Sequence, residues 1–493
     1  MLTSADYAPL PPQSDPYQKT LLGRFDRRFL GLPYVRVALA IGLLAALFIP
    51  TVQFCKRIQE IDTSLFRAEG SRHRTALGRW LPTMELVFQG KDAANPYGYG
   101  HWFPTPPPVL LAAAPLAKLG YFGAGVVWSI AKLVGFFGAM AYFVTGFRVT
   151  GRTVPVGVLL VAAAFSIRPV ISDIQHGNLN LFMLIWLALA WSCFVRGRDV
   201  AAGVFVALAI VTKVTPGLLL VYFLYKRQWR IVAATLVALA VLLLLLPGLA
   251  IGFDTNIEWL RTWFDMLARP YALEGFATIE IANQSLYGTL LRTLGNAGIL
   301  SLEHMPAQRA LQAGMEDMAR PATALGRLLR PAISLSILLA LAWLCRAKQM
   351  ATSGCIDTPS PSKGEGWNEG KSSHASSPTR ARSNPALWLE FAIVLVAMLL
   401  MSERTWKHHA TTLPLVFIAV WYVLVTIDWT NRFRAWFVGG LVAQLFLLVV
   451  GSEGLLGDDV AEKLLDGGLF CWGLVLCGVQ TGILLHQLRL RCG

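Results

Sequence analysis

Apolar runs close to the length of a bilayer span recur along the whole chain and constrain its fold more than any other feature. A helix needs roughly 20 apolar residues to cross the hydrocarbon core of a membrane. Of the 493 residues, 55% are hydrophobic and only 15% are charged, and the mean hydropathy is +0.53. This composition excludes an ordinary soluble domain. The sequence therefore predicts an all-α polytopic membrane protein, a bundle of about 12 transmembrane helices.

Basic residues beside the short loops set the predicted orientation of the spans. Lys and Arg next to a span favour the cytoplasmic side, and basic clusters lie at residues 148–152, 196–198 and 226–230. Both termini are then cytoplasmic. A short apolar segment at 106–119, which opens with three prolines, is predicted to be re-entrant or interfacial. The spans are predicted at residues 35–52, 121–144, 154–167, 181–195, 200–212, 214–225, 231–251, 332–345, 387–401, 410–426, 435–450 and 469–485.

Polar stretches divide the chain into four parts. Residues 1–32 form a cytoplasmic N-terminal tail, and residues 33–345 form a transmembrane core with outer loops at 54–105 and 252–330. Residues 346–386, rich in Ser, Pro, Gly and Lys, form a disordered cytoplasmic linker. Residues 387–493 supply the C-terminal transmembrane helices. Within the outer loops we expect a short helix at 75–88 and an amphipathic helix near 307–327.

The net charge of +14 is explained by topology and by anionic lipid headgroups, because much of it lies in loops beside spans. The lipid bilayer is therefore an expected partner and nucleic acid is not. The seven cysteines are scattered, mostly in apolar runs, and lack metal-type spacing, so they are interpreted as free thiols.

Two polar turns interrupt the apolar hairpins between residues 154 and 230, at 172–180 and at 212–216. The basic clusters lie at the opposite ends of these hairpins, so both turns are predicted to meet on the outer face. Polar groups at membrane depth are costly and are usually functional. The candidate binding residues that the predicted topology gathers there are His176, Asn178, Asn180, Lys213, Asn283, Gln284, Trp406, His408 and His409.

Lys213 is the sharpest of these candidates. We expect it at the start of a short half-helix, where backbone N–H groups and the positive end of the dipole also favour an anion. A phosphate is the anion expected at a lipid–water boundary. The alternative is that the lysine snorkels to the interface without binding anything.

Each of the other polar candidates also has an interpretation that does not involve a ligand. His408 and His409 follow Trp406, and adjacent histidines on a helix point roughly 100° apart, so a shared metal needs further ligands. Hydrogen bonding to a sugar or phosphate, metal binding and structural capping all stay open for them. Asn178 and Asn180 either contact a ligand or satisfy the backbone of their turn.

If the bound group is transferred to a hydroxyl, the reaction needs a general base near the acceptor. Asp62 follows the first span at the outer surface and is the preferred candidate, with Glu60, Asp173 and Glu85 as alternatives. The competing interpretation is that Asp62 only pairs with Arg57 or Arg67.

Several short motifs are spread over residues 78–414. They are GKD at 90–92 with PY at 96–97, FPTPP at 103–107 with APLA at 114–117, GNLN at 177–180, AG at 202–203, KVTP at 213–216 with RQW at 227–229, NQSL at 283–286 with Arg292, and WKHH at 406–409. Together they resemble glycosyltransferase family 87 (the DUF2029 group), polyprenyl-phosphate-dependent membrane transferases of the GT-C superfamily. In many members an Asp stands upstream of the Pro-Tyr pair, where this chain has Gly78, Arg79 and Trp80.

The resemblance implies a GT-C-like bundle that transfers a hexose, usually mannose, from a polyprenyl-phosphate sugar donor to a lipid or glycan acceptor, with inversion. Such enzymes place an acid in the first outer loop, which falls on Asp62 here. Lys213, with help from His408, His409 and Arg79, would contact the donor phosphate. No cofactor is implied; a divalent metal is compatible with the chemistry but is not required.

The resemblance also implies a multi-pass protein of the cell (inner) membrane whose active site faces the extracytoplasmic side. A transporter or flippase of lipid-linked glycans is the alternative. Transporters often show related halves, and the two halves of this sequence show no such symmetry.

Overall fold

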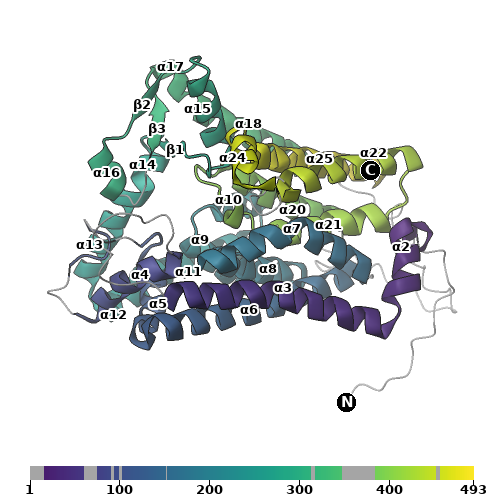
Figure 1. The fold of residues 1–493 in the computed structure, drawn as a ribbon, viewed down its shortest axis with the longest axis horizontal. Helices are drawn as coiled ribbons and strands as arrows, with labels where there is room; N and C mark the ends of the chain where they lie inside the picture. The colour runs from purple at the N-terminus through teal and green to yellow at the C-terminus, as the bar shows by residue number, and fades with distance from the viewer. Residues whose placement is uncertain are drawn as a thin grey trace, which may run out of the picture.

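The computed structural model describes residues 16–59, 75–89, 94–98, 101, 103–150, 153–312, 317–346, 384–450 and 456–492. These residues form long helices packed side by side, with three short strands at one end (Figure 1). The prediction of an all-α membrane protein is confirmed. In Figure 1, α3 and α6 run along the lower edge, and α4, α5, α12 and α13 gather at the left end below the strands.

The helices are α1 (Pro16–Lys19), α2 (Leu21–Phe25), α3 (Pro33–Gln59), α4 (Ala76–Glu85), α5 (Pro107–Ala113), α6 (Gly120–Gly146), α7 (Val156–His176), α8 (Asn180–Val195), α9 (Asp199–Thr212), α10 (Gly217–Tyr225), α11 (Trp229–Ala240), α12 (Leu246–Ile251), α13 (Phe253–Trp263), α14 (Arg269–Ala272), α15 (Leu286–Asn296), α16 (Ala307–Gln312), α17 (Ala324–Arg327), α18 (Leu329–Leu344), α20 (Pro385–Met401), α21 (Leu413–Thr426), α22 (Asn431–Leu445), α24 (Asp458–Asp466) and α25 (Leu469–Cys492). Short 3₁₀ or π-helical segments adjoin them at η1 (Asp26–Leu30), η4 (Leu86–Phe88), η6 (Ala114–Leu119), η7 (Phe147–Thr150), η8 (Val241–Leu245), η9 (Phe264–Ala268), η10 (Lys407–His409) and η11 (Phe446–Val450). The strands are β1 (Ala277–Thr278), β2 (Leu302–His304) and β3 (Met318–Pro321).

Each of the predicted spans falls on a helix. Within the described ranges, eight helical stretches are long and apolar enough to cross a membrane, and α8, α9 and α20 are shorter apolar helices. The chain is therefore a multi-pass membrane protein. The eight stretches are Pro33–Gln59, Pro107–Val149, Val156–His176, Trp229–Ile251, Ala324–Leu344, Lys407–Thr426, Asn431–Val449 and Leu469–Arg491.

Helices α20 and α21 form the centre of the bundle. In the stretch that contains α21, 94% of an 18-residue apolar window is buried. α21 packs against α7 and α20, and α20 also packs against α25. On the other side, α8 lies between α6 and α9. The ring of Trp191 on α8 stacks on Phe391 of α20 at 4.3 Å between centroids. Buried aromatic pairs of this kind contribute large apolar areas, so they hold the N-terminal and C-terminal helices together.

The first polar turn is shorter than predicted. Instead of a turn over 172–180, α7 continues to His176 and α8 begins at Asn180. Gly177 ends α7 in the left-handed conformation (φ +66°), and its N–H donates to the Asp173 carbonyl at 3.0 Å. Because glycine adopts this conformation without steric cost, the reversal needs only three residues, and Asp173 stays buried inside the helix.

Lys213 does not begin a half-helix, so that prediction is wrong. It follows α9 in an extended conformation (φ −157°, ψ 136°), and its N–H donates to the Ala209 carbonyl at 2.9 Å. Proline restricts the residue before it and has no N–H, so α10 starts only after Pro216, at Gly217. Lys213 therefore lies at the carbonyl end of α9, where the helix dipole favours a cation.

The prediction of an amphipathic helix near 307–327 is also wrong. The structure has the short helix α16, then β3, then the single turn α17. β3 pairs antiparallel with both β1 and β2, with Ala319 opposite Ala277 and His304. Pairing between segments distant in sequence overrode the local helical pattern. The short helix predicted at 75–88 is confirmed as α4 and η4.

Candidate active site

A cavity of about 300 Å³ lies where α4, the turn between α7 and α8, the junction between α9 and α10, and the loop before η10 meet. All these elements come from distant parts of the chain. Its lining residues are Arg79, Trp80, Pro104, Thr105, Pro106, Asn178, Leu179, Asn180, Thr212, Lys213, Val214, Thr215, Trp263, Leu267, Ala268, Tyr271, Ala272, Ser402, Glu403, Arg404, Trp406 and His409. Six of the residues predicted to bind substrate are brought together here: Arg79, Asn178, Asn180, Lys213, Trp406 and His409.

Three basic side chains, those of Arg79, Lys213 and Arg404, line this cavity. Burial and the positive charge of Arg404 lower the pKa of Arg79 to about 10, so Arg79 remains protonated at neutral pH. Glu403 also belongs to the lining, and its carboxylate pairs with Arg330. A buried group of like charges is electrostatically unfavourable, and an anion bound among them would relieve the repulsion.

Arg79 is fixed by the first turns of α4. The Thr75 hydroxyl accepts from the Gly78 N–H at 3.2 Å and caps the helix. Trp80, the next residue, is buried with its ring edge-on to Phe103 at 5.5 Å and to Trp128 at 6.4 Å. A capped helix and a buried tryptophan together hold the neighbouring guanidinium at the cavity.

The turn between α7 and α8 supplies two amides. Asn178 uses its side-chain oxygen to accept from the Leu179 N–H at 2.7 Å, as the alternative interpretation of this residue expected, and it also lines the cavity. The Asn180 side-chain oxygen accepts from Lys213 Nζ at 3.0 Å. The Trp128 indole N–H donates to the Gly177 carbonyl at 3.1 Å and ties the turn to α6.

The predicted histidines occupy two different places. His409 lines the cavity, and its Nδ1 lies 2.9 Å from the Arg404 carbonyl; an Nδ1–H donor there leaves Nε2 as the acceptor atom. His408 is buried behind the lining and stacks on His176 with ring centroids 4.6 Å apart. Within the described ranges no group of three or more His, Cys, Asp or Glu side chains could hold a metal ion.

Asn283 and Gln284 do not line the cavity. Asn283 donates to the Thr278 and Glu403 carbonyls at 2.7 and 3.0 Å and accepts from the Thr405 N–H at 2.8 Å. Gln284 donates to the Leu465 carbonyl at 2.7 Å. Both are fully buried, and hydrogen bonds from these two residues to Glu403 and Thr405 hold the loop that carries Arg404.

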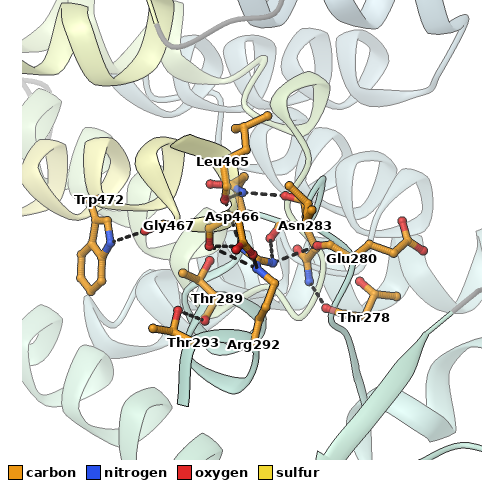
Figure 2. Close-up of polar contacts among 12 residues, drawn as sticks. Thr278, Glu280, Asn283, Thr289, Arg292, Thr293, Leu465, Asp466, Gly467 and Trp472 are labelled. Atoms are coloured by element: carbon orange, nitrogen blue, oxygen red, sulfur yellow. Dashed lines mark hydrogen bonds and ion pairs between the residues drawn. The ribbon is translucent and has the colours of Figure 1, made fainter. Parts of the chain in front are cut away.

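Figure 2 shows the network around Asn283, in which Arg292 of α15 reaches Leu465 and Asp466 at the end of α24. Arg292 donates to the Glu280, Asn283 and Leu465 carbonyls at 2.9–3.1 Å and pairs with Asp466 at 3.1 Å. One guanidinium thus satisfies several loop carbonyls that would otherwise be buried without a donor.

Asp62 and Glu60, two of the proposed bases, lie outside the described residues. Asp173 is fully buried in an ion pair with Lys132, and Glu85 is exposed at the end of α4. The identity of the base remains a prediction.

The residues missed by the sequence analysis are Arg404, Trp263 and Tyr271, which all line the cavity. Arg404 stands two residues before Trp406, the first residue of the motif at 406–409, and its guanidinium carbon lies 4.0 Å from the centre of the Trp406 ring. An arginine beside a tryptophan in an outer loop is a cation–π signal that could have added it to the candidates.

The helices define a multi-pass membrane protein with a polar cavity, and comparison with known sequences identifies its family. The sequence model of glycosyltransferase family 87 matches residues 103–355, just over half of the chain. The chain belongs to this family and is a membrane glycosyltransferase. The matched region includes Asn178, Asn180 and Lys213 and ends before Arg404.

Two individual proteins are similar to the chain. A polyprenol-phosphate-mannose-dependent alpha-(1-2)-phosphatidylinositol mannoside mannosyltransferase of Mycobacterium tuberculosis is 29% identical over 163 residues, which cover 31% of this chain and 38% of that protein. The chain thus matches less than two fifths of the length of this relative. The crystal structure of ArnT from Cupriavidus metallidurans in the apo state aligns with a TM-score of 0.34 and 13% identity, over 90% of this chain and 78% of that chain.

Proposed function

We propose that the protein transfers a hexose, and mannose in particular, from a polyprenyl-phosphate sugar to a lipid or glycan acceptor on the extracytoplasmic side of the cell membrane. The name of the mycobacterial relative supports a polyprenol-phosphate-mannose donor. The cluster of Arg79, Lys213 and Arg404 in one cavity is the structural observation that carries the proposal.

The cationic cluster suits the phosphate of the donor. During transfer the bond between the anomeric carbon and the phosphate oxygen breaks, and the phosphate leaves with the electron pair. Positive groups already in place stabilise that developing charge without having to reorganise. Since they can do so directly, the mechanism does not require a divalent metal.

The remaining lining suits a sugar. Trp263, Tyr271 and Trp406 supply aromatic surface, and Asn178 and His409 supply polar atoms. Ligand sites commonly combine such apolar walls with a few placed polar groups. The hydroxyls of a hexose would hydrogen-bond to the amide and imidazole while a ring face packs on an indole.

Transfer is proposed to proceed by a single displacement with inversion. Asp62 would accept the proton of the acceptor hydroxyl, whose oxygen attacks the anomeric carbon from the face opposite the phosphate. Asp62 follows α3 in the sequence, and α3 packs against α6 and α7. α7 leads into the turn before Asn180, and α6 is tied to that turn by Trp128. The basic clusters at 148–152, 196–198 and 226–230 support the extracytoplasmic placement of the cavity.

The test uses the purified full chain in lipid nanodiscs with polyprenyl-phosphate mannose and an extract of membrane lipids as acceptor source. Labelled mannose should appear in a lipid or glycan product, whereas Lys213→Met and Asp62→Asn should each lower the rate at least about 100-fold. Thr235→Val is the control, because Thr235 does not line the cavity and its hydroxyl donates to the Gly203 and Ile231 carbonyls. Full activity in Lys213→Met would overturn the proposed donor site, and transfer from a nucleotide sugar but not from the lipid donor would overturn the donor class.

A further inference from the structure

An ion pair is buried between two membrane helices beside the cavity. Lys132 of α6 and Asp173 of α7 lie 2.7 Å apart, with their side chains 2% and 0% exposed. Ionisable groups at membrane depth are costly and commonly serve a function. A packed apolar pair would join two helices at least as well as a buried ion pair does, so helix packing by itself does not account for these residue types.

The second oxygen of Asp173 connects the pair to the cavity. Asp173 Oδ1 accepts from Asn180 Nδ2 at 3.1 Å, and Asn180 Oδ1 accepts from Lys213 Nζ at 3.0 Å. A carboxylate only accepts and an ammonium only donates. The Asn180 amide can therefore take one orientation, with its NH₂ toward Asp173 and its oxygen toward Lys213.

This orientation decides where the charge of Lys213 lies. A lysine side chain is long and flexible, and its ammonium has three donors. Among the described residues, Lys213 Nζ donates to Asn180 Oδ1, which leaves two N–H groups for the cavity that Lys213 lines.

We propose that Lys132, Asp173 and Asn180 form a positioning relay that fixes the Lys213 ammonium at the phosphate of the donor. Neither Lys132 nor Asp173 lines the cavity; both act through the Asn180 amide. The inference rests on the proposed function, because it takes the ligand of Lys213 to be the donor phosphate.

The backbone around the relay is built to keep it rigid. The Asp173 carbonyl accepts from the Gly177 N–H at 3.0 Å and lies 3.3 Å from Lys132 Nζ. The Thr411 hydroxyl donates to the Asn180 carbonyl at 3.0 Å, which ties the first residue of α8 to the segment that follows His409. A displacement of the ammonium by about 1 Å can lower the rate on the order of 100-fold.

The test replaces both charges together, so that neither is left unpaired. Lys132→Met with Asp173→Leu removes the acceptor of Asn180 Nδ2 and should lower kcat/KM for the lipid donor about 10- to 100-fold. Glu390→Gln is the matched control, because it alters another deeply buried carboxylate, which pairs with Lys226 at 2.9 Å away from the cavity. Glu390→Gln should lower the thermal stability but leave kcat/KM of the folded protein within about twofold.

A mutant cycle with Lys213→Met distinguishes an effect on the position of Lys213 from a general disruption of the fold. If the relay acts through Lys213, the triple variant Lys132→Met/Asp173→Leu/Lys213→Met has the same kcat/KM as Lys213→Met. Losses that multiply would show that the pair has only a structural role and would overturn the proposal. A normal kcat/KM in Lys132→Met/Asp173→Leu, with Lys213→Met impaired, would also overturn the relay. That result would leave the proposed function intact.

If Lys213→Met is fully active, the proposed donor site fails and the relay fails with it. If the double variant does not give a monodisperse protein, Asn180→Leu breaks the relay at its last link with the ion pair intact. That variant should show the same loss and the same lack of additivity with Lys213→Met, and additive losses would refute the relay.

Discussion

The guanidinium of Arg79 on α4 and that of Arg404 before η10 line one cavity, and burial together with the repulsion from Arg404 lowers the pKa of Arg79 to about 10. The two residues come from opposite ends of the chain. Their like charges are brought together at a cost, which a bound phosphate would offset.

Replacement of Arg79 by glutamine should therefore weaken donor binding. Loss of a charge-assisted hydrogen bond weakens binding by about 1.5–3 kcal/mol of free energy. We therefore expect KM for the lipid donor to rise about 10- to 100-fold with a smaller change in kcat. Steady-state kinetics over donor concentration checks this. An unchanged KM would show that Arg79 does not meet the donor.

The lowered pKa also predicts a pH dependence. Arg79 is charged below about pH 10 and loses its proton above it, so donor affinity in the wild type should fall as pH rises through that region. A bound phosphate favours the charged form and shifts this fall to higher pH. The pH dependence of donor KM should be shallower in Arg79→Gln, and identical slopes would contradict the assignment.

Chelation of divalent metals should leave the transfer rate unchanged. The proposed leaving group meets the three cations of Arg79, Lys213 and Arg404, which can neutralise it without a metal. Activity is compared before and after treatment with EDTA, and again after Mg²⁺ or Mn²⁺ is added back. A loss upon chelation that metal restores would require a metal in the mechanism.

Gly177 should not tolerate a side chain. A Cβ there would lie 2.4 Å from the Phe54 ring, and the residue has φ +66°. Gly197 is the matched control, because it has φ +74° with nothing within 4 Å of an added Cβ. Gly197→Ala should cost only the strain of about 1–2 kcal/mol, whereas Gly177→Ala should cost more and also lower activity by shifting the Asn180 turn. Thermal unfolding and initial rates of both variants decide the matter, and equal effects would contradict the close-contact argument.

The spans and the Lys213 neighbourhood could be predicted because each depends on local sequence. An apolar run predicts a span wherever it lies, and Lys213 and Asn180 are polar residues inside such runs. The exact placement of Lys213 depends on Pro216, which delays the start of α10. The short strand β3 could not be predicted, since its pairing with β1 and β2 involves segments far apart in the sequence.

The contribution of Arg404 could not be predicted for a related reason. Its position depends on hydrogen bonds from Asn283 to the Glu403 carbonyl and from the Thr405 N–H to Asn283, which no local pattern reveals. Asn283 and Gln284 stand in a motif and were candidates for ligand contact, but the structure uses their side chains to bind the backbone of neighbouring loops. A motif residue can thus serve the site by shaping it.

Asn283→Ala should accordingly impair both stability and catalysis. The side chain is fully buried and makes four hydrogen bonds, to Thr278, Ser285, Glu403 and Thr405. Leaving such buried backbone groups unsatisfied costs about 1–3 kcal/mol each, and the loop with Arg404 loses its anchor, so donor KM should rise as it does in Arg79→Gln. Asn256→Ala is the control, because Asn256 is equally buried and donates to the Leu243 carbonyl at 2.9 Å, outside the cavity lining. If Asn256→Ala raises donor KM as much as Asn283→Ala does, the effect is one of general destabilisation and the loop does not depend specifically on Asn283.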